Sequence, residues 1–246
     1  MRRQVLSLAA VILTAGFVLT PSASAQQQSV NFFVGGFVPT PLDARGDITA
    51  GQSNDVLVRD RDFFSFPFDR FHGPTFGGEY LIGLGDFFDA GASIGFYQQS
   101  VPAADRNFFD TTTGASIASE LKLRIVPFTA TFRYLPLGHR APVVPYVGGG
   151  VGIYGWRYSE SGSFVDYTPP VPKNPPIFNG TFVGSGSATG PVVLGGVKFP
   201  MGPLEPGFEV RWQKAQANLP GPPTFESGRV IDLGGLNYLF TFGIRF

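Results

Sequence analysis

The sequence predicts an all-β protein: an eight-stranded antiparallel up-and-down transmembrane β-barrel, preceded by a cleavable signal peptide. Three observations lead to this fold class. First, the 246 residues include 33 glycines and 26 phenylalanines, and only 15% are charged, against about 25% in an ordinary soluble domain. Second, apolar and polar residues alternate with the period of a strand in eight segments. Third, the connections between these segments alternate between long and short.

The start of the chain has the features of an export signal. Two arginines follow the first methionine, an apolar stretch runs from Val5 to Thr20, and Ala23 and Ala25 form a small-x-small cleavage site. We therefore expect the first 25 residues (1–25) to be a signal peptide and residues 26–246 to be the barrel domain. The alternative is a transmembrane anchor, because the apolar stretch approaches the shortest spanning length; the well-formed cleavage site favours the signal peptide.

The eight expected strands share a period-2 pattern, and glycine, proline, asparagine or aspartate bounds them. They are Val30–Val38, Thr75–Leu84, Phe87–Gln99, Leu121–Leu135, Val143–Arg157, Pro191–Phe199, Gly207–Ala217 and Val230–Phe246.

The connections between these strands indicate the cellular location. The first, third and fifth are long, the second, fourth and sixth are short, and the seventh is intermediate. Bacterial outer-membrane barrels have short periplasmic turns and long outer loops, and an even strand count leaves both termini in the periplasm. A soluble sandwich has no reason to alternate in this way. We therefore expect a bacterial outer-membrane location, with outer-membrane lipids around the barrel.

The two faces of most strands can be told apart. Apolar residues occupy alternate positions, and a membrane barrel turns them toward lipid whereas a soluble barrel turns them inward. Alternation alone does not decide between these, but large aromatic residues near strand ends are typical of interfacial girdles. Ordinary β-propensity of aromatic residues is the other explanation. The expected girdle residues are Tyr80, Tyr134, Tyr146, Tyr154, Trp156, Tyr158, Trp212 and Tyr238.

The fourth expected strand does not keep one apolar face. Its apolar positions change parity near Pro127, from Leu121 and Leu123 to Phe128 and Phe132. Because proline cannot donate a ladder hydrogen bond, we expect a β-bulge at this point.

The faces opposite the apolar ones carry a set of charged residues that we expect inside the barrel. An eight-stranded barrel has an interior about wide enough for side chains alone, and the acids and bases are mixed. Structural pairing is the favoured interpretation, and a gated narrow channel is the alternative. The expected lumen cluster is Glu79, Asp89, Arg133, Lys198, Glu209, Arg211 and Arg245.

The first long connection is unusually aromatic for a loop that faces water. One interpretation is a patch that binds a ligand or an extracellular partner. The favoured one is a folded extension above the membrane, or a lid that closes the mouth. The residues concerned are Phe63, Phe64, Phe66, Phe68 and Phe71.

Several function classes find no support. The chain has no cysteine, which excludes disulfides and thiolate metal sites. After signal removal it carries 16 basic and 18 acidic residues, so no basic surface for nucleic acid is expected. His72 and His139 are expected to be exposed, without a nucleophile and an acid at a recognisable spacing. We therefore expect neither an enzyme nor a cofactor or metal site.

The C-terminal segment resembles that of a known family. Tyr238, Phe240, Phe242, Ile244 and the final Phe246 lie on one face, like the terminal strand of small outer-membrane barrels of the OmpA, OmpX, OmpW and opacity-protein kind. The glycine-rich stretch Pro145–Gly152 is also similar to theirs. The resemblance covers residues 26–246 and implies that the barrel assembly machinery reads the last strand. The resulting expectation is a non-enzymatic barrel with a structural or surface-interaction role. A narrow channel for small or apolar solutes and a soluble periplasmic ligand-binding barrel are the alternatives.

Overall fold

The computed structural model describes residues 27–40, 54–111, 113–166, 175–221, 225 and 230–246. The expected signal peptide, with Ala23 and Ala25, lies outside the described residues. No helix within the described part of the chain has the length and apolar character needed to cross a bilayer.

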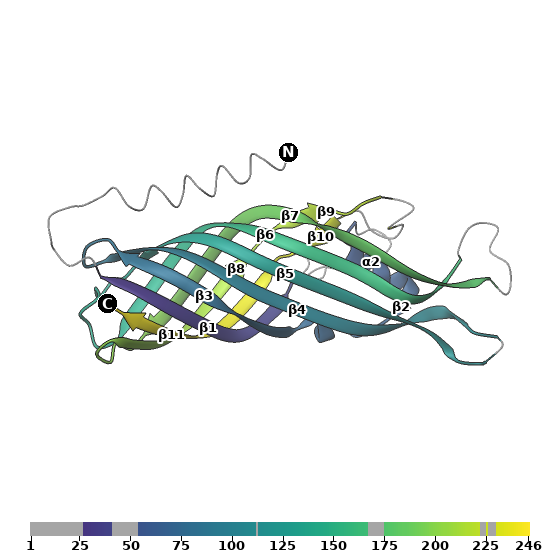
Figure 1. Ribbon diagram of the computed structural model, residues 1–246, viewed down its shortest axis with the longest axis horizontal. Helices are drawn as coiled ribbons and strands as arrows, with labels where there is room; N and C mark the ends of the chain where they lie inside the picture. The colour runs from purple at the N-terminus through teal and green to yellow at the C-terminus, as the bar shows by residue number, and fades with distance from the viewer. Residues whose placement is uncertain (1–26, 41–53, 112, 167–174, 222–224, 226–229) are drawn as a thin grey trace.

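The fold is an antiparallel barrel in which eight strands close into a ring (Figure 1). Neighbours in the ring are hydrogen-bonded in the order β4-β3-β1-β11-β8-β7-β6-β5, and the pairing of β4 with β5 closes it. The ring strands are β1 (Gln28–Pro39), β3 (Gly73–Gly83), β4 (Phe88–Phe109), β5 (Ser116–Tyr134), β6 (Val144–Val165), β7 (Ile177–Lys198), β8 (Leu204–Gln213) and β11 (Gly235–Arg245).

Smaller elements fold within the first connection and within the last one. Between β1 and β3 lie the helix α2 (Val56–Phe63), the short strand β2 (Phe64–Ser65) and the 3-10 helix η3 (Phe68–Phe71). Between β8 and β11, β9 (Gln216–Asn218) pairs with β10 (Val230–Asp232) as a separate two-stranded sheet. The expected single strand Val230–Phe246 is therefore wrong, because the chain leaves the small sheet before β11 begins at Gly235.

The short connections and the two described ends of the chain lie at the same end of the barrel. The amide of Gln28 donates to the carbonyl of Phe246 at 3.2 Å, and the amide of Leu84 donates to the carbonyl of Phe88 at 2.7 Å across the tightest turn. Gly85 has a φ of 74° in that turn, a conformation that favours glycine. We call this the periplasmic end, and the opposite end the outer mouth.

The barrel wall is much taller on one side. Strands β4, β6 and β7 have 22 residues each and β5 has 19, whereas the other four ring strands have 10 to 12. The two tall hairpins project beyond the outer mouth (Figure 1). The expected long loops over Ser100–Glu120 and Tyr158–Gly190 are therefore mostly strand. Their polar and glycine residues concealed this, since these ladders extend past the apolar band.

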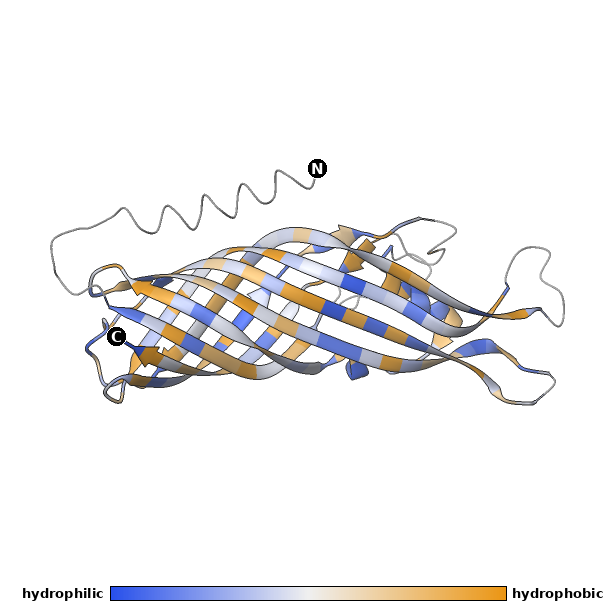
Figure 2. Ribbon diagram, viewed as in Figure 1, coloured by the Kyte–Doolittle hydropathy of each residue, from blue (hydrophilic) through white to orange (hydrophobic). Residues whose placement is uncertain are grey.

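The outer surface of the lower barrel is an apolar band that includes all eight ring strands. Figure 2 shows the alternation of apolar and polar residues along the strands. Large apolar side chains of every ring strand are exposed on the outside, where a soluble protein would keep them covered. One or two examples from each strand are Phe32, Phe76, Ile94, Phe128, Phe132, Val151, Ile153, Val193, Phe208 and Phe240. Lipid is the environment that such a band fits.

The expected bulge at Pro127 is wrong. The register of β5 with β4 and β6 continues without a shift through this residue. Leu121, Leu123 and Ile125 are buried in the barrel, whereas Phe128 and Phe132 face outward. The apolar parity changes because the surroundings change: the interior is polar in the lower barrel and apolar near the mouth.

Half of the expected aromatic girdle lies inside the barrel. The inward residues are Tyr146, Tyr154, Trp156 and Tyr158, each at most 5% exposed. The outward ones are Tyr80, Tyr134, Trp212 and Tyr238.

Candidate functional site

The lower lumen contains a ring of two arginines and two glutamates from three strands, β3, β5 and β8. Arg133 of β5 donates to both carboxylate oxygens of Glu79 (2.7 and 2.8 Å) and to Oε2 of Glu209 (2.7 Å). Arg211 of β8 lies 2.6 Å from Oε1 of Glu209 and 3.4 Å from Oε1 of Glu79. All four side chains are at most 5% exposed, and their charges cancel. The ring thus crosses the barrel from wall to wall.

Neutral hydrogen-bonding groups complete this ring. Tyr146 donates its hydroxyl to Oε2 of Glu209 at 3.0 Å, and its ring lies beneath the Arg133 guanidinium at 4.7 Å. Arg211 donates to the hydroxyl of Ser93 at 3.0 Å. Buried charges are tolerated when they are paired and hydrogen-bonded. These contacts pair all four charges and leave Nε of Arg133 without a hydrogen-bond partner among the described residues.

A second charged group lies closer to the periplasmic end. Lys198 of β7 lies 3.2 Å from Oδ2 of Asp89, and Nε2 of His139 lies 3.3 Å from Oδ1 of the same carboxylate. His139 is only 9% exposed, so the expectation of an exposed turn histidine is wrong for this residue. The turn between β5 and β6 folds back beneath the barrel, since the His139 amide donates to the carbonyl of Asp86 at 3.0 Å.

Of the seven expected lumen residues, the structure brings six together in these two groups. The seventh, Arg245, lies at the periplasmic rim with 28% of its side chain exposed, 3.3 Å from Glu205. Its position on the inward parity of β11 is as expected, but the strand ends there and the side chain turns toward Gly202.

Two inward-facing glycines make room for these side chains. A Cβ on Gly148 would approach Cγ of Arg133 to 3.0 Å, and a Cβ on Gly196 would approach Oη of Tyr146 to 2.6 Å. A narrow barrel can therefore hold Arg133 and Tyr146 at this level only because their cross-strand partners on the adjacent strands, Gly148 and Gly196, carry no side chain.

The upper lumen is filled by the aromatic first connection. Phe64, Phe66 and Phe71 are at most 8% exposed and pack in one apolar core with inward residues of β4, β5 and β6. Phe63 and Phe68 are partly buried against the same core. The aromatic segment thus closes the mouth from inside, as the lid interpretation expects, and does not present a water-facing patch.

The connection between β8 and β11 joins this core. Leu219, Phe225, Ile231 and Leu233 are buried in it, and Phe225 packs against Tyr158 with the rings tilted and their centroids 5.9 Å apart. Two outer connections that are far apart in sequence therefore share one hydrophobic lid.

Buried acids tie the lid to the wall. Tyr158 of β6 donates to Oδ2 of Asp60 in α2 at 2.5 Å. Asp55 caps α2 by accepting from the Leu57 amide at 2.8 Å. Burial raises the pKa of Asp55 to about 7. Within the described residues no group of histidine, cysteine and acidic side chains could hold a metal ion.

Chemically, this lumen is closed at two levels, one polar and one apolar.

No protein-family model matches the sequence, and no curated protein matches it. Among solved structures, the outer membrane protein OprG from Pseudomonas aeruginosa is similar at 13% identity and a TM-score of 0.51, over 90% of this chain and 96% of that chain. This chain has the fold of a small outer-membrane β-barrel. Together with the apolar band on all eight strands, it is the fold of a protein that sits in a bacterial outer membrane.

Other outer-membrane barrels match over similar lengths with lower scores. The N-terminal barrel domain of Pseudomonas aeruginosa OprF matches at 13% identity and a TM-score of 0.39, over 90% of this chain and 99% of that one. Ail of Yersinia pestis, in complex with a heparin analogue, matches at 11% identity and 0.42, over 90% and 99%.

The lid acids and the apolar upper core were missed by the sequence analysis. Asp55 and Asp60 lie in a connection whose local sequence gives no strand period, and their partners Asp232 and Tyr158 are far along the chain. The parity change at Pro127 was the available signal for the apolar upper interior.

Proposed function

We propose that this protein is a closed, non-enzymatic outer-membrane barrel whose function lies at its outer end, in a structural or surface-interaction role. The observation that carries the proposal is the double closure of the lumen. The ring of Arg133, Arg211, Glu79 and Glu209 crosses the lower barrel, and the aromatic lid fills the mouth above it. A solute would have to displace both.

Planar-bilayer recording tests the closure. The full barrel, refolded in detergent and inserted into a bilayer, is expected to give no discrete openings, while a heat-dependent gel shift shows that it is folded. Discrete, reproducible openings of the unaltered protein would overturn the proposal and favour the narrow channel. In that case Glu209→Ala and Arg211→Ala are expected to change the conductance, because both side chains block the same level.

The projecting hairpins support the surface-interaction role. Phe109 at the end of β4 is 61% exposed, and Ile177 and Phe178 at the start of β7 are 41% and 43% exposed. The hairpins that contain the end of β4 and the start of β7 project beyond the outer mouth (Figure 1). Exposed apolar groups above the lipid band favour contact with a partner surface. Cells that display the protein are expected to adhere to an apolar surface more strongly than cells that display a Phe109→Ser, Phe178→Ser variant at the same surface level. Equal adhesion would remove the hairpin tips from this role.

A further inference from the structure

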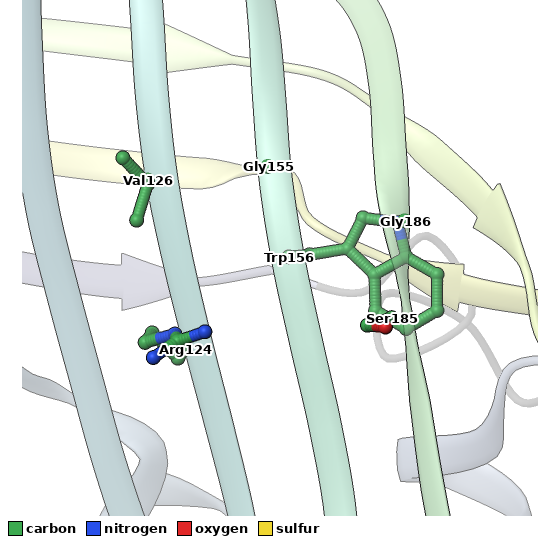
Figure 3. Close-up of a pocket in the computed structure, with 6 residues that line it drawn as sticks. All are labelled: Arg124, Val126, Gly155, Trp156, Ser185 and Gly186. Atoms are coloured by element: carbon green, nitrogen blue, oxygen red, sulfur yellow. The ribbon is translucent and has the colours of Figure 1, made fainter. Parts of the chain in front are cut away.

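A hollow of about 370 Å³ lies on the outer wall of the tall hairpins. It is lined by Arg124, Val126, Gly155, Trp156, Ser185 and Gly186 (Figure 3). These residues belong to three adjacent strands, β5, β6 and β7. Because Gly155 is on the outward parity of β6 and carries no side chain, the wall is recessed between the flanking side chains.

Two arginines lie side by side at this level. Arg124 and Arg157 are directly paired across β5 and β6, and Arg157 is in turn paired with Ser185 of β7. Both arginines are exposed. Like charges at directly opposite positions of an antiparallel pair are destabilising. Neither forms an ion pair with any other residue that the structure describes. An anion between the two guanidinium groups would remove this repulsion.

More positive than negative charge lies on this outer face. Lys122 lies on the same face of β5 as Arg124, two residues closer to the outer end of the strand. Glu120 lies on that face a further two residues outward. The nearby outward positions of β4 and β7, Gln98 and Ser185, are uncharged and are the cross-strand partners of Arg124 and Arg157. Three cations therefore share this part of the wall with one acid.

Trp156 lies behind the hollow, because its side chain is on the inward parity of β6 and belongs to the apolar core inside the barrel. Trp156 is only 5% exposed, and its indole Nε1 has no hydrogen-bond partner among the described residues. The indole lies beside Gly186, where an added Cβ would come within 3.4 Å of Nε1 (Figure 3). Buried tryptophan N–H groups usually find a partner, but this one faces the barrel interior, so Trp156 is a reporter next to the hollow and not a ligand-binding group.

The height of the hollow matches the headgroup level of the outer leaflet. Ten residues of β5 separate Arg124 from Tyr134, which is exposed at the periplasmic end of the strand. With about 3.3 Å per residue and a strand tilt of about 40°, ten residues rise about 25 Å along the barrel axis. The lipid-facing band of such barrels is about 25 Å tall. Arg124 therefore lies where the acyl chains end, directly above the outward side chains of Val126 and Phe128.

From this arrangement we propose that Arg124, Arg157 and the adjacent hollow bind the phosphate group of a phosphorylated glycolipid in the outer leaflet. Arginine binds phosphate oxygens with charge-assisted hydrogen bonds. The hydroxyl of Ser185 then serves a sugar or phosphate oxygen, and the acyl chains lie along the apolar band below. The site is on the outside of the wall, so it does not depend on whether the lumen is closed.

Intrinsic fluorescence can report binding, because the chain has two tryptophans. Trp212 lies on the lipid-facing parity of β8, so Trp212→Phe leaves Trp156 as the sole emitter. This variant, folded in detergent, would be titrated with a bisphosphorylated glucosamine-based glycolipid and with the same glycolipid after dephosphorylation. We expect saturable quenching or a shift of the Trp156 emission, with an affinity at least tenfold higher for the phosphorylated form. Equal affinities for the two glycolipids would overturn the proposal. In this experiment Arg124 and Arg157 are both unaltered, so a negative result cannot come from a damaged site.

Variants assign the effect to the arginines. Arg124→Ala with Arg157→Ala is expected to weaken binding of the phosphorylated glycolipid at least tenfold, whereas Arg124→Lys with Arg157→Lys retains most of it. Arg140→Ala, at an exposed turn of the periplasmic end, is the matched control and should leave the affinity unchanged. Unchanged binding by the double alanine variant, or an equal loss in the Arg140 variant, would overturn the assignment. So would inorganic phosphate that competes as strongly as the glycolipid, since the site would then be one for a soluble anion.

Discussion

The carboxylate of Asp55 accepts a hydrogen bond from the backbone amide of Asp232 at 2.8 Å. This contact joins the first outer connection of the chain to the last. The same carboxylate accepts from the amide of Leu57, so one buried side chain both caps α2 and fastens it to β10. The lid is therefore one unit, and Asp55 is the residue at which its two parts meet.

Loss of the Asp55 carboxylate should loosen the lid without unfolding the barrel. In Asp55→Ala the helix cap and the bond to Asp232 are both lost, at a cost of about 2 kcal/mol to the lid. Amide hydrogen exchange, read by mass spectrometry, should become faster in residues 56–71, while the ladders of β1 and β11 keep their protection. Unchanged exchange in α2 would contradict the role given to Asp55.

Lid stability should also depend on pH. The pKa of Asp55 is raised from 3.8 to about 7, chiefly by burial and also by the charge of Asp232, while hydrogen bonds from backbone amides act in the opposite direction. Because the closed lid binds this proton more tightly than the open one, closure is most stable below about pH 4. It weakens as the pH rises toward 7 and then levels off.

The matched variant for this pH dependence is Asp55→Asn, which keeps a capping oxygen and cannot ionise. Exchange protection of residues 56–71, corrected for intrinsic rates, should fall between pH 5 and pH 8 in the unaltered protein and stay nearly level in the variant. The same fall in both proteins would assign the pH dependence to other groups.

Prediction from sequence succeeded where the pattern is local and failed where partners are remote. The outward faces of β8 and β11 follow from alternation alone, because each residue's side is set by its parity. The upward extension of β6 and β7 was missed, since their polar and glycine residues lack an apolar face beyond the lipid band. A folded extension or lid was expected in the first connection, but its anchoring was missed because contacts such as Asp60 with Tyr158 join distant segments.

The candidate lumen site was accessible to sequence reasoning for a similar reason. Glu79, Asp89, Arg133 and Arg211 lie on inward parities, and a narrow barrel brings inward charges together. Parity says nothing of height, however. Arg245 has the right parity but lies at the rim beside Glu205, and His139 reaches Asp89 only through the fold of a turn.

The central arginine should matter far more than the rim arginine. Arg133→Met leaves Glu79 and Glu209 buried without their main partner, and such a change costs about 3–5 kcal/mol of unfolding free energy. Arg245→Met breaks a partly exposed pair, which is worth at most about 1 kcal/mol. Urea unfolding in detergent, followed by tryptophan emission, measures both. Adding Glu209→Gln to Arg133→Met should recover part of the loss; no recovery would mean that packing, not unpaired charge, dominates.

Two adjacent glycines of β7 offer a test of the space around the ring. A Cβ on Gly196 would lie 2.4 Å from the carbonyl oxygen of Phe208 and 2.6 Å from Oη of Tyr146, so Gly196→Ala forces the wall or the tyrosine to move. Such overpacking costs about 1–3 kcal/mol. Gly195 faces outward, and a Cβ there would lie 3.7 Å from the carbonyl oxygen of Tyr146; Gly195→Ala should therefore be neutral or slightly stabilising. The midpoint of the heat-dependent gel shift compares the two variants, and equal midpoints would show that Tyr146 and β8 yield freely at this level.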